Sequence, residues 1–309
     1  PVGWAQEVHA FGDPRWAVGL LGLAFAAAGS LVAFTLVARR DLGAGLLPDR
    51  AGRADAPRTL SGGLGLAWLL HRGVLSGWLI GAALLSMVLG GLVANVGSFL
   101  DGDAKAMIEA LGGQQAIEAA FVAAEFSFIG LFLAAYAVAA LLRLRSEEAA
   151  GRRDGLLAPP LGGPGPGGPH GLAALGGAAA LLTVIGVLAG FSISRALDDG
   201  QWWGQVAGAA AVQLPAIAVM VGLCMLAIGL APRAAVGLSW GLLTAFFLLG
   251  QVGPMLELPQ WALDLSPFSH TPRLPGAEVD ATALVALSVT AAVLITAGLA
   301  AYRRRDLTT

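Results

Sequence analysis

Long apolar runs separated by short polar stretches are the feature that most restricts how this chain can fold. A helix needs about 20 apolar residues to cross the hydrocarbon core of a bilayer. Because backbone groups inside a bilayer must be hydrogen-bonded within the protein, continuous apolar runs of this length favour helices. We therefore expect an all-α, polytopic membrane protein with about seven transmembrane helices. The predicted spans cover residues 16–38, 76–99, 117–142, 171–194, 205–230, 234–254 and 281–302.

Basic residues are distributed unequally between the two sets of connecting loops. Loops on the cytoplasmic side of a membrane carry an excess of arginine and lysine. The pattern predicts that the N-terminus lies outside and the C-terminus inside. The four basic residues assigned outside are Arg15, Lys105, Arg195 and Arg273. Those assigned inside are Arg39, Arg40, Arg50, Arg53, Arg58, Arg72, Arg143, Arg145, Arg152, Arg153, Arg233, Arg303, Arg304 and Arg305.

Composition excludes several classes of protein. With 57% hydrophobic and 12% charged residues, the chain does not resemble a soluble domain. The net charge is −2 and the charges fall in short loops, so we expect no nucleic-acid partner. The single cysteine, Cys224, lies in an apolar run and indicates neither a disulfide framework nor a cysteine-ligated metal. We expect His9, His71, His170 and His270 in loops, without the spacing of metal ligands.

Catalytic motifs are also missing from the sequence. A Walker A loop needs a Gly-Lys-Ser/Thr end whose lysine reaches the phosphates. The one lysine, Lys105, stands in Asp-Gly-Asp-Ala-Lys-Ala, so the chain carries no ATPase of this type. No Gly-x-Ser-x-Gly nucleophile motif occurs either. We predict no catalytic residue, no metal and no cofactor bound by this chain.

The densest run of charge, residues 143–160, lies between two predicted spans. Its arginines predict a cytoplasmic loop, which a soluble partner can reach. A solvated turn without a partner is the alternative interpretation.

The segment Glu147-Glu148-x-x-Gly151-Arg152-x-Asp154-x-Leu156-Leu157-Ala158-x-Pro160 resembles the first cytoplasmic loop of type-2 ATP-binding cassette (ABC) exporter permeases. More narrowly, the chain resembles actinobacterial permeases known as exporters of polyketide antibiotics. The resemblance extends over nearly the whole chain and includes Gln213-Leu214-Pro215, residues 258–270 and Arg303-Arg304-Arg305-Asp306.

The resemblance implies a coupling helix that docks on a separately encoded ATPase, which would bind the ATP. The residues it assigns to this coupling loop are Arg145, Glu147, Glu148, Gly151, Arg152, Asp154 and Pro160. One departure is the glycine- and proline-rich stretch 161–170, which opposes helix and predicts a loose far end of the coupling element.

A repeated span end suggests how the chain is divided. The span 16–38 ends on Arg39-Arg40-Asp41-Leu42, and the last span ends on Arg303-Arg304-Arg305-Asp306-Leu307, whose Asp306 lies 265 residues after Asp41. We predict that residues 1–58 contain the last span of a first permease half and a cytoplasmic linker. Residues 59–309 would form a second half with an interfacial elbow helix over 59–72 and six spans.

Three polar or helix-breaking positions inside predicted spans are candidates for a transport path. Glu125 is an acid well inside a span, where a charge costs about 2.5–3.5 kcal/mol at mid-bilayer. It is either hydrogen-bonded or protonated in the helix bundle, or it contacts a polar or cationic substrate. Pro215 frees a backbone carbonyl and Gln213 needs a partner in hydrocarbon. They predict either a kinked helix or a flexible point on the path.

Two further patterns concern packing. Glycine pairs at 77 and 81, 186 and 190, and 237 and 241 predict close contacts between helices. Residues 254–275 are rich in proline yet keep apolar side chains, which indicates an amphipathic cap on the outer side.

Together these features predict the permease subunit of an ATP-driven ABC exporter in a bacterial plasma membrane. Its expected substrates are amphipathic small molecules such as polyketide antibiotics, and its expected partners are an ABC ATPase, the other permease half and the lipid bilayer. Two other functions stay open: a proton-coupled secondary transporter that uses Glu125, and a membrane scaffold without transport.

Overall fold

The computed structural model describes residues 4, 7–8, 15–38, 63–96, 113–149 and 167–304, with the backbone alone at 113–114 and 147–149. Within these ranges all regular structure is helical, which confirms the all-α prediction. Six of the described helical segments are long and apolar enough to cross a membrane, and the shorter apolar helix over Ala235–Gln251 accompanies them. The chain is therefore a polytopic membrane protein.

The chain divides into two compact units, residues 1–56 and 57–309. The first unit contains helix α2 (Trp16–Ala38), whose bounds equal the predicted ones. None of its residues is buried, and large apolar side chains such as Leu20 and Phe34 are exposed on all sides. A helix that is apolar all round is typical of a membrane span.

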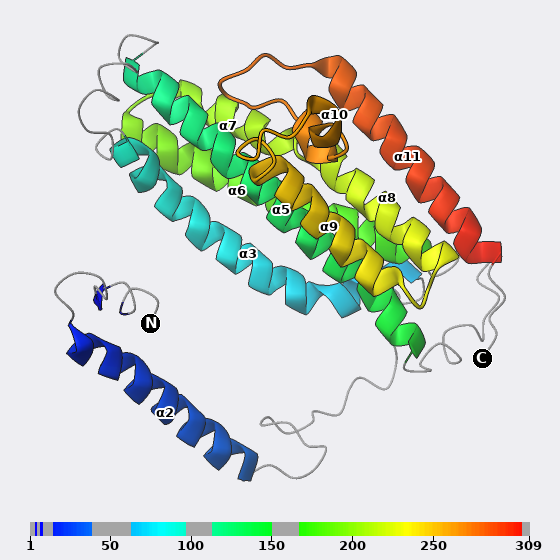
Figure 1. Cartoon of the computed structure of the whole chain (residues 1–309), viewed down its shortest axis with the longest axis horizontal. Coiled ribbons are helices and arrows are strands. Elements are labelled where there is room, and N and C mark those ends of the chain that lie inside the picture. Colours follow the sequence, from blue (N-terminus) through cyan, green and yellow to red (C-terminus); the bar gives the residue numbers. More distant parts are fainter. Residues whose placement is uncertain are drawn as a thin grey trace. The chain divides into compact units, whose positions relative to one another are not determined.

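The second unit is a bundle of long helices that run back and forth along one axis (Figure 1). Two short helices, α10 and η3, lie in the segment between α9 and α11. The elements are α3 (Gly63–Asn95), α5 (Gly113–Ala149), α6 (Gly167–Leu197), α7 (Gln201–Ala211), α8 (Leu214–Leu230), α9 (Ala235–Gln251), α10 (Gln260–Leu263), the 3₁₀-helix η3 (Pro267–His270) and α11 (Ala281–Arg304).

Three helix boundaries differ from the predicted spans because residues near the ends are compatible with helix. The expected elbow residues 63–72 are helical and continue without interruption into the span, as one helix, α3. Helix α5 extends to Ala149 through Arg, Leu and Glu, which have high helix propensity. Helix α6 begins at Gly167, so the end of the glycine- and proline-rich stretch is helical. Pro169 falls in its first turn, where a missing N–H is tolerated.

The predicted span 205–230 lies within the candidate membrane span Gln201–Leu230, which is interrupted near Gln213 and Pro215, where a kink was predicted. Helices α7 and α8 are separate, and a turn at Val212 and Gln213 joins them. Pro215 lies at the start of α8 and lacks the N–H that a continuous helix would need there. The chain instead closes a tighter turn, in which the Gln213 backbone N–H donates to the Ala210 carbonyl at 3.2 Å.

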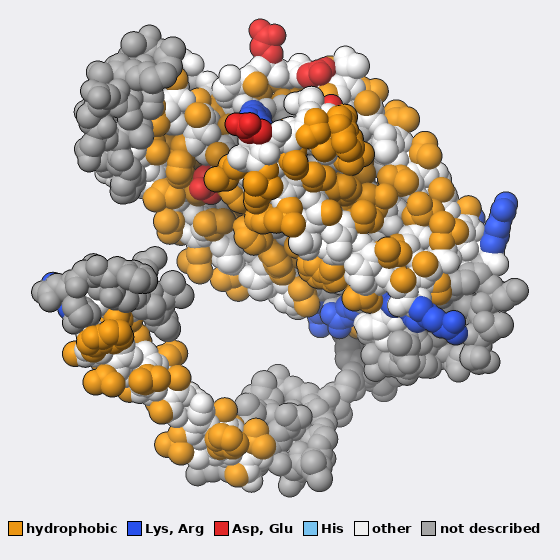
Figure 2. Space-filling view, viewed as in Figure 1, with side chains coloured by type: hydrophobic (Ala, Val, Ile, Leu, Met, Phe, Trp, Pro, Cys, Tyr) orange, Lys and Arg blue, Asp and Glu red, His pale blue; other side chains and the backbone are white. Residues whose placement is uncertain are grey.

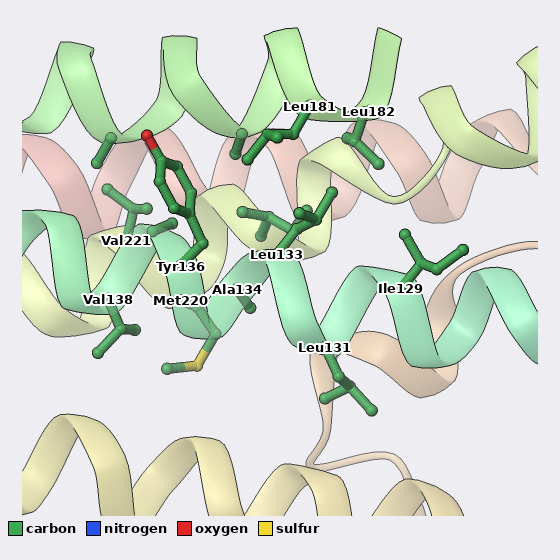
Figure 3. Packing of buried hydrophobic residues seen from close by; sticks show 14 of the residues in the cluster. Ile129, Leu131, Leu133, Ala134, Tyr136, Val138, Leu181, Leu182, Met220 and Val221 are labelled. Atoms are coloured by element: carbon green, nitrogen blue, oxygen red, sulfur yellow. The ribbon is translucent and has the colours of Figure 1, made fainter. Parts of the chain in front are cut away.

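The core is centred on α5, which contacts α6, α8 and α9. Around it, α3 and α7 pack on α6, and α11 packs on α8. Figure 3 shows Tyr136 reaching from α5 to α6 beside Leu133 and Met220. The Tyr136 hydroxyl lies against Gly177, where any side chain would collide with it. Small residues thus let the aromatic ring fill the space between the helices.

Of the three predicted glycine pairs, one forms a close helix contact. Gly186 and Gly190 of α6 face α7, and a Cβ at position 190 would lie 3.1 Å from the Trp203 carbonyl oxygen. A Cβ added at Gly77, Gly81, Gly237 or Gly241 would have no atom of another described segment within 4 Å. The prediction of close helix contacts is therefore wrong for these two pairs within the described part of the chain. Their helical spacing alone could not reveal which face of the helix is covered.

The bundle has two ends with different charge. Basic side chains gather at the end where α8 and α11 finish, and acidic ones at the opposite end (Figure 2). We call these the cytoplasmic end and the outer end, following the predicted orientation. The cytoplasmic end carries Arg72, Arg143, Arg145, Arg233, Arg303 and Arg304, and the outer end carries Arg195 and Arg273.

Candidate functional site: an outer cavity and a cytoplasmic junction

A cavity of about 770 Å³ opens near the outer end, between α5, α9 and the segment that contains α10 and η3. These elements lie beside one another in Figure 1 and are in contact. The volume is in the range of cavities that bind drug-sized molecules. Its walls are formed by Ala116, Ala119, Ala120, Ala123, Ala124, Ser127, Leu131, Leu249, Gly250, Gln251, Pro254, Gln260, Leu263, Phe268, Ser269, Thr271, Arg273, Gly276 and Ala277.

The α5 wall of the cavity is made almost entirely of alanine. Ala116, Ala120 and Ala124 recur every four residues and therefore share one helical face. Methyl side chains leave room that larger residues would fill. This wall can contact the hydrocarbon part of a ligand, and its one polar side chain, Ser127, already donates its hydroxyl to the Ala123 carbonyl at 2.9 Å.

Polar groups lie on the other walls, and most of them are already engaged. The hydroxyl of Thr271 donates to the Phe268 carbonyl at 2.7 Å, and the Gln260 amide donates to Asp264 at 2.7 Å. The side chains of Gln251 and Arg273 make no hydrogen bond or ion pair with the described residues. An apolar wall facing two unengaged polar groups suits an amphipathic ligand.

Glu125 does not line this cavity. The cavity is lined by the face of α5 that carries Ala120, Ala123 and Ser127, and with 3.6 residues per turn the half-buried Glu125 lies on roughly the opposite side of the helix. Its carboxylate makes no hydrogen bond with the described residues. A substrate in this cavity would therefore not contact Glu125, and its predicted part in a transport path stays a prediction.

Gln213 and Pro215 lie away from the cavity walls. The Gln213 side chain is only 3% exposed and packs against Gly130 of α5. Its Oε1 atom has no hydrogen-bond partner among the described residues. Gly130 has no side chain, which provides the space for this amide between α5 and the start of α8. Any part these residues play in transport would act through the α7–α8 turn.

The predicted coupling loop begins on a helix. Arg145, Glu147 and Glu148 belong to the last turns of α5, so the first part of the charged stretch is helical. Arg145 Nε donates to the Pro232 carbonyl at 3.0 Å and so joins α5 to the turn between α8 and α9. The side chains of Glu147 and Glu148 lie outside the described part of the structure, as do the residues Gly151, Arg152, Asp154 and Pro160.

The first turn of α6 follows the charged stretch and forms a junction of several helices. Pro169 contacts Gly63 of α3, and Gly167 lies against the Tyr302 ring of α11. One residue beyond the turn, Gly171 lies against Met225 of α8. A displacement of this turn would therefore be transmitted to three other helices.

Two histidines meet at this junction, contrary to the expectation that they lie in loops. His71 belongs to α3 and His170 to α6, and both side chains are buried. His71 Nε2 lies 3.1 Å from His170 Nδ1, in hydrogen-bond distance. The two residues are 99 positions apart, so no local sequence spacing could have indicated the pair. No group of three metal-ligating side chains occurs among the described residues.

Comparison with known proteins gives two matches. Residues 60–303 match the family described as the C-terminal domain of the multidrug efflux system permease Rv1217c. The chain is also 40% identical over 310 residues to the multidrug efflux system permease protein Rv1217c of Mycobacterium tuberculosis (strain ATCC 25618 / H37Rv). This match covers 99% of the chain and 56% of the relative, so the chain spans little more than half of that protein's length.

Proposed function

Because this chain belongs to the family of Rv1217c-like multidrug efflux permeases, we propose that it is the second membrane half of an ATP-driven ABC exporter. Its spans place it in the bacterial plasma membrane as a multi-pass protein. The observation that carries the proposal is the family match over residues 60–303, the range that contains the cavity and the junction. The other permease half and a separate ATPase complete the transporter.

The proposed substrates are amphipathic small molecules, with polyketide antibiotics as one class. Such molecules have a broad apolar body and a few polar groups at the edge. The alanine wall of α5 would contact the body, while Gln251 and Arg273 would bind polar or anionic groups. Few directional contacts would allow the site to accept substrates of different shape.

The energy would enter at the cytoplasmic end. An ATPase docked on residues 145–160 would shift the end of α5 and the start of α6 during its cycle. The Arg145–Pro232 hydrogen bond supports transmission to α8 and α9, and α9 also forms a wall of the cavity. Tilting of these helices would change the cavity between loading and release.

Proton-coupled transport through Glu125 is the second candidate. The half-buried carboxyl group inside a membrane helix favours it, because such a group can bind and release a proton. The ABC exporter requires ATP, whereas the proton-coupled transporter requires a proton gradient. Replacing Glu125 by glutamine should inactivate only the proton-coupled transporter.

The deciding assay measures uptake of a fluorescent anthracycline into inverted vesicles that contain the complete permease and its ATPase. With ATP present and the proton gradient collapsed by an uncoupler, we expect uptake to continue. Glu125→Gln should leave the maximal rate within about twofold, since it removes a charge and keeps the shape. Glu278→Gln, at an exposed outer position, is the control. Loss of uptake on uncoupling, together with an inactive Glu125→Gln variant, would replace the ABC proposal by the proton-coupled one.

A further inference from the structure

The buried pair of His71 and His170 at the junction can bind protons near neutral pH, and the proposed transport cycle does not use this property. The side chains of His71 and His170 are 4% and 7% exposed. Their rings meet edge to face, with centroids 5.3 Å apart and planes inclined by 78°. This orientation directs a nitrogen of one ring at a nitrogen of the other.

The hydrogen bond between the two rings requires a neutral partner. A neutral imidazole carries one N–H donor and one acceptor nitrogen, whereas a protonated imidazole carries two donors and no acceptor. With one ring or both rings neutral, one nitrogen can donate and the other accept. With both rings protonated, two N–H groups and two positive charges would face each other at 3.1 Å. The contact is therefore stable at neutral pH and repulsive when both rings bind a proton.

The charges around the pair add to this repulsion. The positive charge of Arg143 on α5 is close enough to His71 to repel a proton on its ring. Arg72 follows His71 on α3 and is exposed. On α11, the Tyr302 ring lies against the first turn of α6, and the exposed Arg303 and Arg304 follow it. On α8, the adjacent contact is the uncharged Met225.

The position of the pair links it to the charged stretch. His170 lies in the first turn of α6, the first described turn after residues 150–166. His71 precedes the predicted span 76–99, and His170 precedes the predicted span 171–194. Helix α3 has 33 residues and is about 50 Å long, which exceeds a hydrocarbon core of about 30 Å. Arg72, next to His71, is exposed, and a charged side chain near the end of a span reaches the membrane surface. Protons from the cytoplasm can therefore reach this end of the bundle.

We propose that His71 and His170 form a proton-sensitive latch, which holds the first turn of α6 against α3 at neutral pH and releases it when the cytoplasm becomes acidic. Release would separate the charged stretch from the helices that it has to move. ATP hydrolysis by the partner would then drive less export. The effect on export rests on the proposed function, whereas the latch itself is a property of this chain.

Two substitutions remove the proton dependence and keep a hydrogen bond. In His170→Asn the side-chain amide replaces Nδ1, and in His71→Gln it replaces Nε2. An amide has both a donor and an acceptor, so it can pair with the remaining histidine in either protonation state. His270→Gln is the matched control, because His270 is an exposed histidine at the outer end, where its Nε2 lies 2.9 Å from the Asp264 carbonyl oxygen.

The first measurement is the melting temperature of the complete permease in lipid nanodiscs, without the ATPase. An ordinary imidazole has a pKa of about 6.5, so histidines are mostly neutral at pH 7.5 and mostly protonated at pH 5.5. The folded pair disfavours binding of a second proton, whereas two separated histidines in the unfolded chain do not. The contribution of the His71–His170 contact to folding stability is therefore present above about pH 6.5 and is lost as the pH falls below it. We expect the melting temperature of the wild type and of His270→Gln to fall by about 2–4 °C more than that of His170→Asn or His71→Gln.

The second measurement is the amount of anthracycline exported per ATP hydrolysed at the same two pH values. This ratio should fall at acidic pH in the wild type and stay nearly constant in the two latch variants. Equal pH dependence of the melting temperature in the wild type and in both latch variants would overturn the latch and leave the proposed function intact. The expected melting behaviour in a complex that exports nothing at any pH would support the latch and refute the proposed function.

Discussion

Glycine residues at the crossings of helices determine how closely the bundle packs. On α11, a Cβ at Gly298 would lie 2.7 Å from the Leu226 backbone nitrogen of α8. On α8, a Cβ at Gly229 would lie 2.8 Å from the Gly298 carbonyl oxygen. The obstructing atoms belong to the backbone, so no side-chain rotation can relieve the contact. Small residues allow such close approach between membrane helices, where dispersion attraction is the main source of association.

Gly298→Ala should therefore destabilise the second unit. One additional methyl group would force α11 away from α8, at a cost of about 1–3 kcal/mol for overpacking. The free energy of unfolding, measured by denaturant titration in mixed micelles, should fall by this amount. Gly237→Ala on α9 is the control, because a Cβ there meets nothing within 4 Å, and its stability should be unchanged or higher. Equal stability of the two variants would contradict the proposed close contact.

Helix α5 connects the two ends of the bundle formed by the second unit. Its outer part supplies the alanine wall of the cavity, and its middle part carries the buried Phe126, Ala134 and Tyr136. Its last turns reach Ala149 and carry Arg145, which binds the Pro232 carbonyl. A rigid element of this length can transmit a movement from one end to the other, as the proposed coupling requires.

Reversing the charge at the end of α5 should weaken binding of the ATPase. In the double variant Glu147→Lys and Glu148→Lys, we expect insertion to be normal, because the positions follow the predicted span. Charge repulsion across the interface should lower the affinity for the ATPase by about tenfold or more. Copurification of the two subunits measures this loss. The matched control is Glu257→Lys with Glu278→Lys, which makes the same charge change at exposed outer positions. Full recovery of the ATPase with the first variant would exclude docking at this helix end.

For the molecule as a whole, the distribution of arginine between the two ends of the bundle bears on its orientation in the membrane. Arg143, Arg233 and Arg303 come from segments far apart in the sequence, yet the fold brings them to the same end. The positive-inside rule assigns that end to the cytoplasm. The cavity would then open toward the outer leaflet.

Thiol labelling tests this orientation. In a Cys224→Ala background, Glu278→Cys should react with a membrane-impermeant maleimide in intact cells, because the position is exposed at the outer end. Arg304→Cys is equally exposed at the other end and should react only after permeabilisation. The reverse labelling pattern would show that the molecule is inserted the other way round.

The sequence alone was sufficient to predict the all-α membrane class, the bounds of α2 and the approximate bounds of the other spans. Each of these depends on one property, the length of an apolar run, which is local to a segment. Helix ends were less predictable, since Arg, Leu and Glu after Leu142 are compatible with both helix and loop. The resemblance to exporter permeases also came from contiguous residues, and the family match confirmed it.

The tertiary structure alone decided which residues meet. Three glycine pairs had the same spacing, but only Gly186 and Gly190 face a neighbouring helix within the described part of the chain. The cavity joins residues of α5 to residues more than 100 positions later, and His71 meets His170 across 99 positions. Such contacts depend on how each helix is rotated about its axis and which neighbour it packs against. A nearly uniform apolar helix carries little information on that rotation, because all its faces have similar free energies in contact with lipid.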